Sequence, residues 1–298
     1  MLVNAIEEVS RYTRAIHTIS RTYSGTISPG SSTLFFVNEN GVAITCKHVA
    51  EIILSADKIN TDFAAFKREK AKLQKDDHYA ANLAALEQQF HIRAETNVQL
   101  KNNFIDCVDN VSNLECIAHP TLDLAILKFQ GYGRLLVRSF ARFVKDPGKV
   151  KQGRYLGRLG FPFPEFTNFT YNAAIDDIEW TAEGNRYTPI FPIDGIITRF
   201  VGDTNAYGEP EISGIELSTP GLRGQSGGPL FDTDGLVYGM QSMTGHLHLG
   251  FDIRDMPLMQ DGKKTSVSNF PFLHVGRCIH VARIKEFLKL HNIKFYEE

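Results

Sequence analysis

From about residue 105 to residue 280 the sequence is a succession of short apolar segments separated by glycine and proline. Examples are YLGRLGFPFP, GIITRFVG, GIELSTPG and GGPLFDTDGLVYGMQSM. Many short strands with turns at this spacing are typical of β-sandwiches and β-barrels. We therefore expect a mainly β fold, built from antiparallel strands.

The composition is that of a globular chain, with 43% hydrophobic and 22% charged residues over 298 positions. The formal charge is -2 and no long basic stripe occurs, so we expect no nucleic-acid partner. No run of 18 or more apolar residues occurs, so we expect no membrane span. Glu7 and Glu8 interrupt what would be the apolar core of a signal peptide, which favours a cytoplasmic location.

The four cysteines are Cys46, Cys107, Cys116 and Cys278. They lack CxxC spacing, which argues against a disulfide framework and against a structural zinc site, and favours a reducing compartment. Another group could face a metal from neighbouring strands: His246, His248, Cys278 and His280. We favour the alternative that these are ordinary strand residues, and we expect no metal.

Helices are expected at both ends of the sequence. Ile6, Val9, Thr13 and Ile16 fall near helical spacing, so we expect an N-terminal amphipathic helix within residues 1–22. The closing segment HVARIKEFLKLHNI has one apolar helical face, formed by Val281, Ile284, Phe287 and Leu288.

A helical insertion is expected at about residues 52–100, where Ala, Lys, Glu, Leu and Gln are common and Pro and Gly are absent. Two amphipathic segments are indicated, with a break near residues 75–78. One contains Phe63, Phe66, Lys70 and Leu73; the other contains Ala80, Leu83, Leu86 and Phe90. The insertion either binds a regulatory partner or gates a cleft, or it only packs on the body of the protein.

A β-hairpin is predicted in SSTLFFVNENGVAITCKHVA, where Asn40 and Gly41 join two apolar runs. The second strand leads directly to His48. The sequence PLFDTDGLVYG later repeats the arrangement of strand, tight turn and strand, which is a weak sign of two related halves.

The segment GLRGQSGGPLF at 221–231 contains a candidate nucleophile, Ser226. A serine hydroxyl needs a base to take its proton and donors for the oxyanion that forms. The glycines let the backbone turn sharply, and the N–H groups of Gly224 and Ser226 are the proposed donors.

His48 is the candidate base, and Asp123 in HPTLDLAILKF is the candidate carboxylate that orients it. Burying an unpaired carboxylate among apolar residues is costly, and a histidine N–H would be a natural partner. The alternative is that Asp123 faces water at the edge of a strand.

These three motifs, GVAITCKHV, HPTLDLAIL and GQSGGPLFDTDGLVYGMQS, stand in the order His48, Asp123, Ser226. The chain resembles the trypsin-like serine peptidases with the chymotrypsin fold, and is most similar to their bacterial HtrA-like branch. The resemblance implies two packed antiparallel β-barrels. Residues 23–140 would form the first, with His48, Asp123 and the insertion, and residues 141–298 the second, with Ser226.

Departures from the family refine these expectations. Gln225 stands where many members have the Asp that pairs with a new N-terminus, so we expect no activation of that kind. Pro220 stands where trypsin has the Asp that selects Arg or Lys. The resemblance places Gln241, Ser242 and Met243 along the substrate cleft, and we expect a modest apolar pocket there. We do not expect the PDZ domain of the HtrA relatives.

The function expected is that of an intracellular bacterial serine endopeptidase acting on a protein or peptide, without a metal or organic cofactor. Its rate would rise as His48 loses its proton, at about pH 6 to 7.5 for an ordinary histidine. Two alternatives remain open: an effector peptidase that is inactive until a partner engages it, and a peptide-binding module on the same fold without catalysis.

Overall fold

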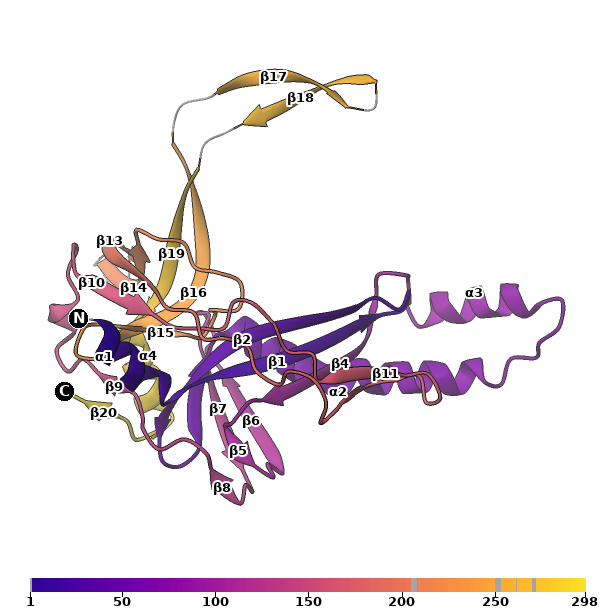
Figure 1. Cartoon of the computed structure of the whole chain (residues 1–298), viewed down its shortest axis with the longest axis horizontal. Coiled ribbons are helices and arrows are strands. Elements are labelled where there is room, and N and C mark those ends of the chain that lie inside the picture. The colour runs from indigo at the N-terminus through magenta and orange to yellow at the C-terminus, as the bar shows by residue number, and fades with distance from the viewer. Residues whose placement is uncertain (1, 205–207, 209, 250–252, 261, 270–271) are drawn as a thin grey trace.

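The computed structural model describes residues 2–204, 208, 210–249, 253–260, 262–269 and 272–298. The protein is mainly β, with two large, predominantly antiparallel sheets and helices at both ends (Figure 1). The first sheet has six strands in the order β4 (Asn97–Phe104), β1 (Thr13–Thr22), β2 (Ile27–Asn38), β3 (Val42–Thr45), β7 (Ala125–Gln130) and β6 (Asn113–Ala118).

The second sheet has eight strands in the order β15 (Pro229–Phe231), β10 (Tyr155–Arg158), β13 (Ile193–Thr204), β14 (Pro210–Leu217), β19 (Phe272–His280), β16 (Val237–His248), β9 (Arg142–Phe143) and β20 (Tyr296–Glu297). Because β15 also pairs with β16, six of these strands close into a barrel. The short strands β9 and β20 add to β16 in parallel. The expected chymotrypsin-like β architecture is therefore confirmed.

Besides the two large sheets, the described residues form three small sheets and one 3₁₀ helix. The pairs are β5 (Val108–Asp109) with β8 (Arg134–Leu135), β11 (Phe169–Asn172) with β12 (Asp177–Trp180), and β17 (Ile253–Gln260) with β18 (Lys263–Asn269). The 3₁₀ helix, η1, spans Pro147–Lys149. The predicted hairpin is formed by β2 and β3, and Gly41 in its turn has a φ of 69°. A side chain at Gly41 would lie 2.7 Å from the ring of Tyr132, so the turn requires glycine.

The N-terminal helix is shorter than expected. Helix α1 spans Leu2–Ser10, and the prediction of helix was wrong beyond it, because residues 13–22 form strand β1. Thr13 and Ile16 match a helical period, but every second residue from Thr13 to Arg21 is also buried. The segment forms a strand rather than a helix because it pairs with β2 on one side and with β4 on the other.

Helix α4 (Val281–Leu290) buries the apolar face predicted from its sequence. The Nδ1 atom of His280 accepts a hydrogen bond from the backbone N–H of Ala282 at 3.1 Å and so caps the helix. One continuous core contains residues of α1, α4 and both large sheets. This shared core fixes the two sheets against each other.

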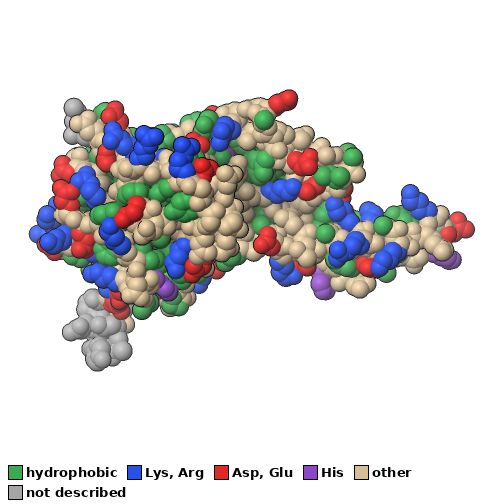
Figure 2. All heavy atoms as spheres, turned by 90° about the horizontal axis from the view of Figure 1, so that it is seen from below, with side chains coloured by type: hydrophobic (Ala, Val, Ile, Leu, Met, Phe, Trp, Pro, Cys, Tyr) green, Lys and Arg blue, Asp and Glu red, His purple; other side chains and the backbone are tan. Residues whose placement is uncertain are grey.

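The insertion consists of α2 (Lys47–Lys70) and α3 (Tyr79–Gln89), which extend away from the sheets (Figure 1). It has a small core of its own, in which Phe63, Phe66 and Leu86 pack with Val98 of β4. Figure 2 shows the insertion as an arm, with basic and acidic side chains interspersed on the face in view. Helix α2 begins before the expected insertion, and it therefore includes His48.

Candidate active site

His48 lies in the first turn of α2, directly after the end of β3. Cys46 is extended, with a ψ of 149°, and its carbonyl accepts a hydrogen bond from the N–H of Ala50 at 3.1 Å, which begins the helix. The side chain of His48 is 47% exposed, so its ring is accessible from solvent. The hairpin thus places this ring at a fixed point on the rim of the first sheet.

Asp123 lies in the turn between β6 and β7, and its side chain is 19% exposed. The Nδ1 atom of His119 accepts hydrogen bonds from the N–H groups of Thr121 and Leu122, which holds the turn. The two carboxylate oxygens of Asp123 lie 3.0 and 2.9 Å from His48 Nδ1, and the backbone N–H of His48 donates to Oδ1 at 3.0 Å. Asp123 is therefore turned toward His48 and away from bulk water.

The pair is electrostatically coupled. Burial alone would raise the pKa of Asp123, but hydrogen bonds from His48 and Ser242 outweigh it and lower this pKa to about 2. The hydrogen bond to Asp123 raises the pKa of His48 above its ordinary value, against the opposing effect of burial. Asp123 is consequently ionised at neutral pH and favours the proton on His48 Nδ1, which leaves Nε2 as the free basic nitrogen.

Ser226 reaches the same cleft from the second barrel. Its backbone carbonyl accepts from the N–H of Thr33 of β2 at 3.0 Å, which ties the loop to the first sheet. Its hydroxyl donates to the carbonyl of Ser242 at 3.1 Å. A cleft of about 380 Å³ is lined by residues of β2, α2 and this loop, and both His48 and Ser226 face it.

Ser242 connects the three groups. It lies at a β-bulge of β16, between Gln241, which pairs with Cys278, and Met243, which pairs with Arg277. A bulge changes the direction of a side chain relative to the regular pleat. The hydroxyl of Ser242 donates to Asp123 Oδ2 at 2.5 Å, while its carbonyl accepts the hydroxyl of Ser226. Its hydroxyl thus holds the carboxylate, and its expected place along the substrate cleft stays a prediction.

The two expected oxyanion donors have free amides: the N–H groups of Gly224 and Ser226 make no hydrogen bond with any described residue. The carbonyl of Gly224 accepts from the Thr33 hydroxyl at 2.8 Å and so is held toward β2. Gly224 has a φ of 98°, and a side chain there would lie 2.5 Å from the carbonyl oxygen of Phe161. The tight loop therefore requires glycine at this position.

The loop is braced from inside by Gln225, which is fully buried. Its side-chain oxygen accepts from the N–H of Leu222 at 3.0 Å, and its amide nitrogen donates to the carbonyl of Phe191 at 3.2 Å. These two hydrogen bonds hold the loop without an ion pair to an N-terminal amine.

The apolar pocket expected beside the nucleophile, at Pro220, Gln241, Ser242 and Met243, stays a prediction. Gln241 and Ser242 are buried, whereas Met243 is 51% exposed. Behind Pro220 lies the guanidinium of Arg158, which donates to the carbonyl of Pro220 at 3.1 Å and to Gln241 Oε1 at 2.5 Å. Polar and cationic groups therefore lie next to Pro220 and Gln241.

Among the described residues, one group has the spacing of a metal site: Cys46, His48 and Asp123. Burial raises the pKa of the Cys46 thiol well above its ordinary value, and this thiol donates to the carbonyl of Gln241 at 3.2 Å. His48 Nδ1 is already bound to Asp123. The thiol and the ring nitrogen are therefore both occupied in hydrogen bonds as protonated groups. Metal ligands must be deprotonated, so this group fits metal ligation poorly.

The residues of the alternative metal hypothesis have other contacts. His246 Nδ1 lies 2.6 Å from His274 Nδ1, and Cys278 is buried with its thiol 3.4 Å from Gln241 Oε1. His280 caps α4, and burial lowers its pKa to about 4. They do not form a joint cluster with His248 in the part of the chain that the structure describes.

Comparison with known families gives a match to the trypsin-like peptidase domain over residues 30–240. This range includes His48, Asp123 and Ser226 and covers well over half of the chain. The chain belongs to the trypsin-like peptidase family. No curated protein matches it significantly. No helix among the described residues is long and apolar enough to cross a membrane.

Among solved structures, the chain is similar to several proteases. The M. tuberculosis protease Rv3671c in its active form has 13% sequence identity and a TM-score of 0.49, with 99% of this chain and 88% of that chain covered. The HtrA-type protease AlgW with a decapeptide has 12% identity and a TM-score of 0.48, covering 97% and 66%. AlgW with a tripeptide has 12% identity and a TM-score of 0.45, covering 98% and 65%.

Two residues of the site were missed in the sequence. Thr33 holds the carbonyl of Gly224, and nothing in the strand around it distinguishes this threonine from its neighbours. Arg158 carried a signal, because a cation between the apolar residues Leu156 and Leu159 requires a compensating environment.

Proposed function

We propose that the chain is a serine endopeptidase that hydrolyses peptide bonds through His48, Asp123 and Ser226 and an acyl-enzyme intermediate. The observation that carries the proposal is the double contact of the Asp123 carboxylate with His48 Nδ1, at 2.9 and 3.0 Å. It fixes the ring with Nε2 as its free nitrogen, at a cleft that Ser226 also lines. A peptide-binding module would not need this arrangement.

The reaction follows the scheme known for Ser-His-Asp peptidases. The hydroxyl of Ser226 exchanges its bond to the Ser242 carbonyl for one to His48 Nε2, gives up its proton there and attacks the peptide carbonyl. The N–H groups of Gly224 and Ser226 donate to the oxyanion. His48 then protonates the leaving amine, and water, deprotonated by His48, hydrolyses the acyl ester.

Fluorophosphonate labelling of the purified protein at neutral pH tests the proposal. The wild type should be labelled, and Ser226→Ala and His48→Ala should not. Ser55→Ala, a change at a half-buried serine of α2 that does not line the cleft, is the matched control and should label like the wild type. Labelling that survives in Ser226→Ala, or a folded wild type that neither labels nor cleaves peptides under any condition, contradicts the proposal.

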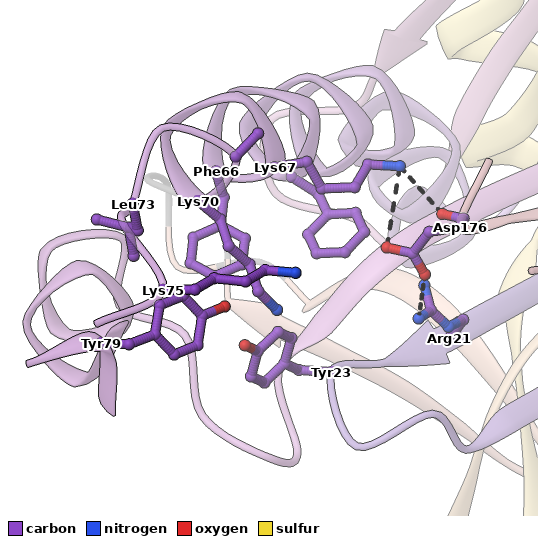
Figure 3. Close-up of a pocket in the computed structure, with 11 residues that line it drawn as sticks. Arg21, Tyr23, Phe66, Lys67, Lys70, Leu73, Lys75, Tyr79 and Asp176 are labelled. Carbon is purple, nitrogen blue, oxygen red and sulfur yellow. Dashed lines mark hydrogen bonds and ion pairs between the residues drawn. The ribbon is translucent and has the colours of Figure 1, made fainter. Parts of the chain in front are cut away.

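A second candidate is an effector peptidase that a partner activates through the insertion. The observation that favours it is a cavity of about 620 Å³ between β1, α2 and α3 (Figure 3). Arg21 and Lys67 are engaged there by Asp176, whereas Lys70 and Lys75 form no ion pair with a described residue. An acidic segment of a partner fits this excess of positive charge.

The two candidates differ in a measurable way. If the second candidate is correct, the purified protein labels slowly and an acidic partner accelerates labelling. The double substitution Lys70→Glu with Lys75→Glu then abolishes the acceleration without changing the basal labelling rate. Full labelling of the isolated protein, unaffected by these substitutions, favours the first candidate.

A further inference from the structure

The cleft at Ser226 has an apolar wall that comes from helix α2. Val49, Ile52 and Ile53 line it together with His48. These positions are three or four residues apart along the helix, so they lie on one helical face. Val49 is buried and Ile53 is half-buried, whereas Ile52 is 44% exposed. The wall therefore offers apolar surface that a side chain of a bound peptide can cover.

The rest of the lining comes from β1, β2 and the loop before the nucleophile. The hydroxyl of Thr18 donates to Asn102 Oδ1 at 2.9 Å, and the hydroxyl of Ser31 donates to the carbonyl of Phe161. These polar groups of the two strands are thus already bonded within the chain. The strands complete the cleft without adding a charged side chain to it.

Arg223 brings a positive charge to the cleft. Its side chain lines the cleft, is exposed, and makes no ion pair with a described residue. None of the described residues that line the cleft is Asp or Glu. Glu51 on the neighbouring turn of α2 is exposed and is not part of the lining. The cleft therefore favours an anionic group beside its apolar wall.

The position of the cleft relative to the nucleophile indicates which half of a substrate enters it. The Ser226 hydroxyl donates to the carbonyl of Ser242 in β16 at 3.1 Å, and no described residue of β16 lines the cleft. The cleft opens instead toward α2, whose His48 gives its proton to the leaving amine in the proposed reaction. The residue that carries this amine lies against the ring of His48, so its side chain reaches the apolar wall that follows His48 along the helix.

We propose that this cleft binds the part of the substrate that follows the cleaved bond, with a large aliphatic side chain in the first position and Asp or Glu in the second. This inference rests on the proposed function. The aliphatic side chain covers Ile52 and Ile53. Because successive side chains of an extended peptide point to opposite sides, the second one faces away from α2, toward the loop with Arg223. These residues determine specificity and do not touch the reacting atoms.

Transfer of an acyl group to added amines tests the leaving half by itself. An ester substrate acylates Ser226, and an amino-acid amide then competes with water: its amine attacks the acyl ester, loses a proton to His48, and the Ser226 oxygen leaves and takes that proton back. We expect leucinamide to compete about 10-fold better than alaninamide. The amide of Leu-Glu should compete about 2- to 5-fold better than that of Leu-Gln, which has nearly the same shape, and this advantage should fall as salt is added.

Substitutions on the two walls should change these preferences separately. Ile52→Ala should reduce the preference for leucine about 3-fold. Leu54→Ala is the matched control, because it removes an exposed side chain of the same helix that does not line the cleft, and it should leave the preference unchanged. Arg223→Gln should abolish the preference for Glu over Gln, and Arg223→Glu should reverse it. Equal transfer to all amides by the wild type, or preferences that survive these substitutions, overturns the proposal.

A binding measurement separates failure of this inference from failure of the proposed function. Ser226→Ala should bind the amide of Leu-Glu about 10-fold or more tightly than the amide of Ala-Gln. This binding preference in a protein that the ester never acylates supports the cleft and rejects the peptidase activity. Acylation of the wild type with equal transfer and equal binding of the amides supports the peptidase and rejects the specificity proposal.

Discussion

Replacing Asp123 by Asn tests the electrostatic description of the site through stability as well as activity. Asn retains the shape and can still accept from the backbone N–H of His48, but it removes the charge. The pKa of Asp123 falls from its ordinary 3.8 to about 2 on folding. At about 1.4 kcal/mol per pKa unit, this corresponds to about 2 kcal/mol of stability for the ionised form.

The direction of the pH dependence follows from the sign of this shift. Because the pKa is lower in the folded state, the stabilisation is fully present above the unfolded pKa near 4 and is lost as the pH falls toward 2. The titration of His48 makes stability depend on pH separately, near neutrality. It remains mostly protonated below about pH 5.5 in both states, so its titration does not contribute there.

Urea unfolding of wild type and Asp123→Asn should therefore be compared at several values between about pH 5.5 and pH 2. We expect the difference in unfolding free energy to shrink by about 2 kcal/mol across this range. Asp62→Asn, which removes an exposed carboxylate from α2, is the control and should show little pH dependence. A difference for Asp123→Asn that stays constant within about 0.5 kcal/mol would refute the reasoning.

Three further predictions concern the site and its support. The labelling rate should rise with pH around a midpoint above 6.5, because the hydrogen bond to Asp123 raises the pKa of His48. Asp123→Asn should move this midpoint to lower pH. A wild-type midpoint below about pH 6 contradicts the coupling of His48 with Asp123. Gly224→Ala should cost about 1–3 kcal/mol in urea unfolding and abolish labelling, since its backbone has a positive φ and its neighbour is a carbonyl oxygen. Lys285→Met should lower the free energy of unfolding by about 1–3 kcal/mol, because the buried amine donates to the carbonyls of Val144 and Lys145. A melting temperature equal to that of the wild type would show that these hydrogen bonds contribute nothing to stability.

The β architecture could be predicted, and the three proposed catalytic residues could be chosen, because local sequence carries the signals. Glycines around Ser226, an Asn-Gly turn before His48 and a carboxylate among apolar residues each have a physical reason that is visible without the structure. The pairing of His48 with Asp123 follows from the fold, which brings together residues 75 positions apart. Thr13 and Ile16 would lie on one face of a helix, but β1 buries residues on both of its faces here, so the same two residues are also buried in a strand; this explains the error.

The surroundings of Arg158 could not be predicted in this way. The sequence places Arg158 among apolar residues, but its partners Thr219, just after β14, and Gln241 of β16 are distant in the chain, and only the closed barrel brings them together. Ser242 is similar. Its position at a bulge turns its hydroxyl to Asp123, and the register of β16 with β19 is not encoded in any one segment.

His48 occupies the first turn of the same helix that forms half of the insertion. At 1.5 Å per residue, the 24 residues of α2 make a rod about 36 Å long, with the imidazole at one end and the cationic cavity near the other. The rod is continuous, without a proline or glycine along it. The distant end of the arm and the proposed catalytic base therefore belong to one uninterrupted helix.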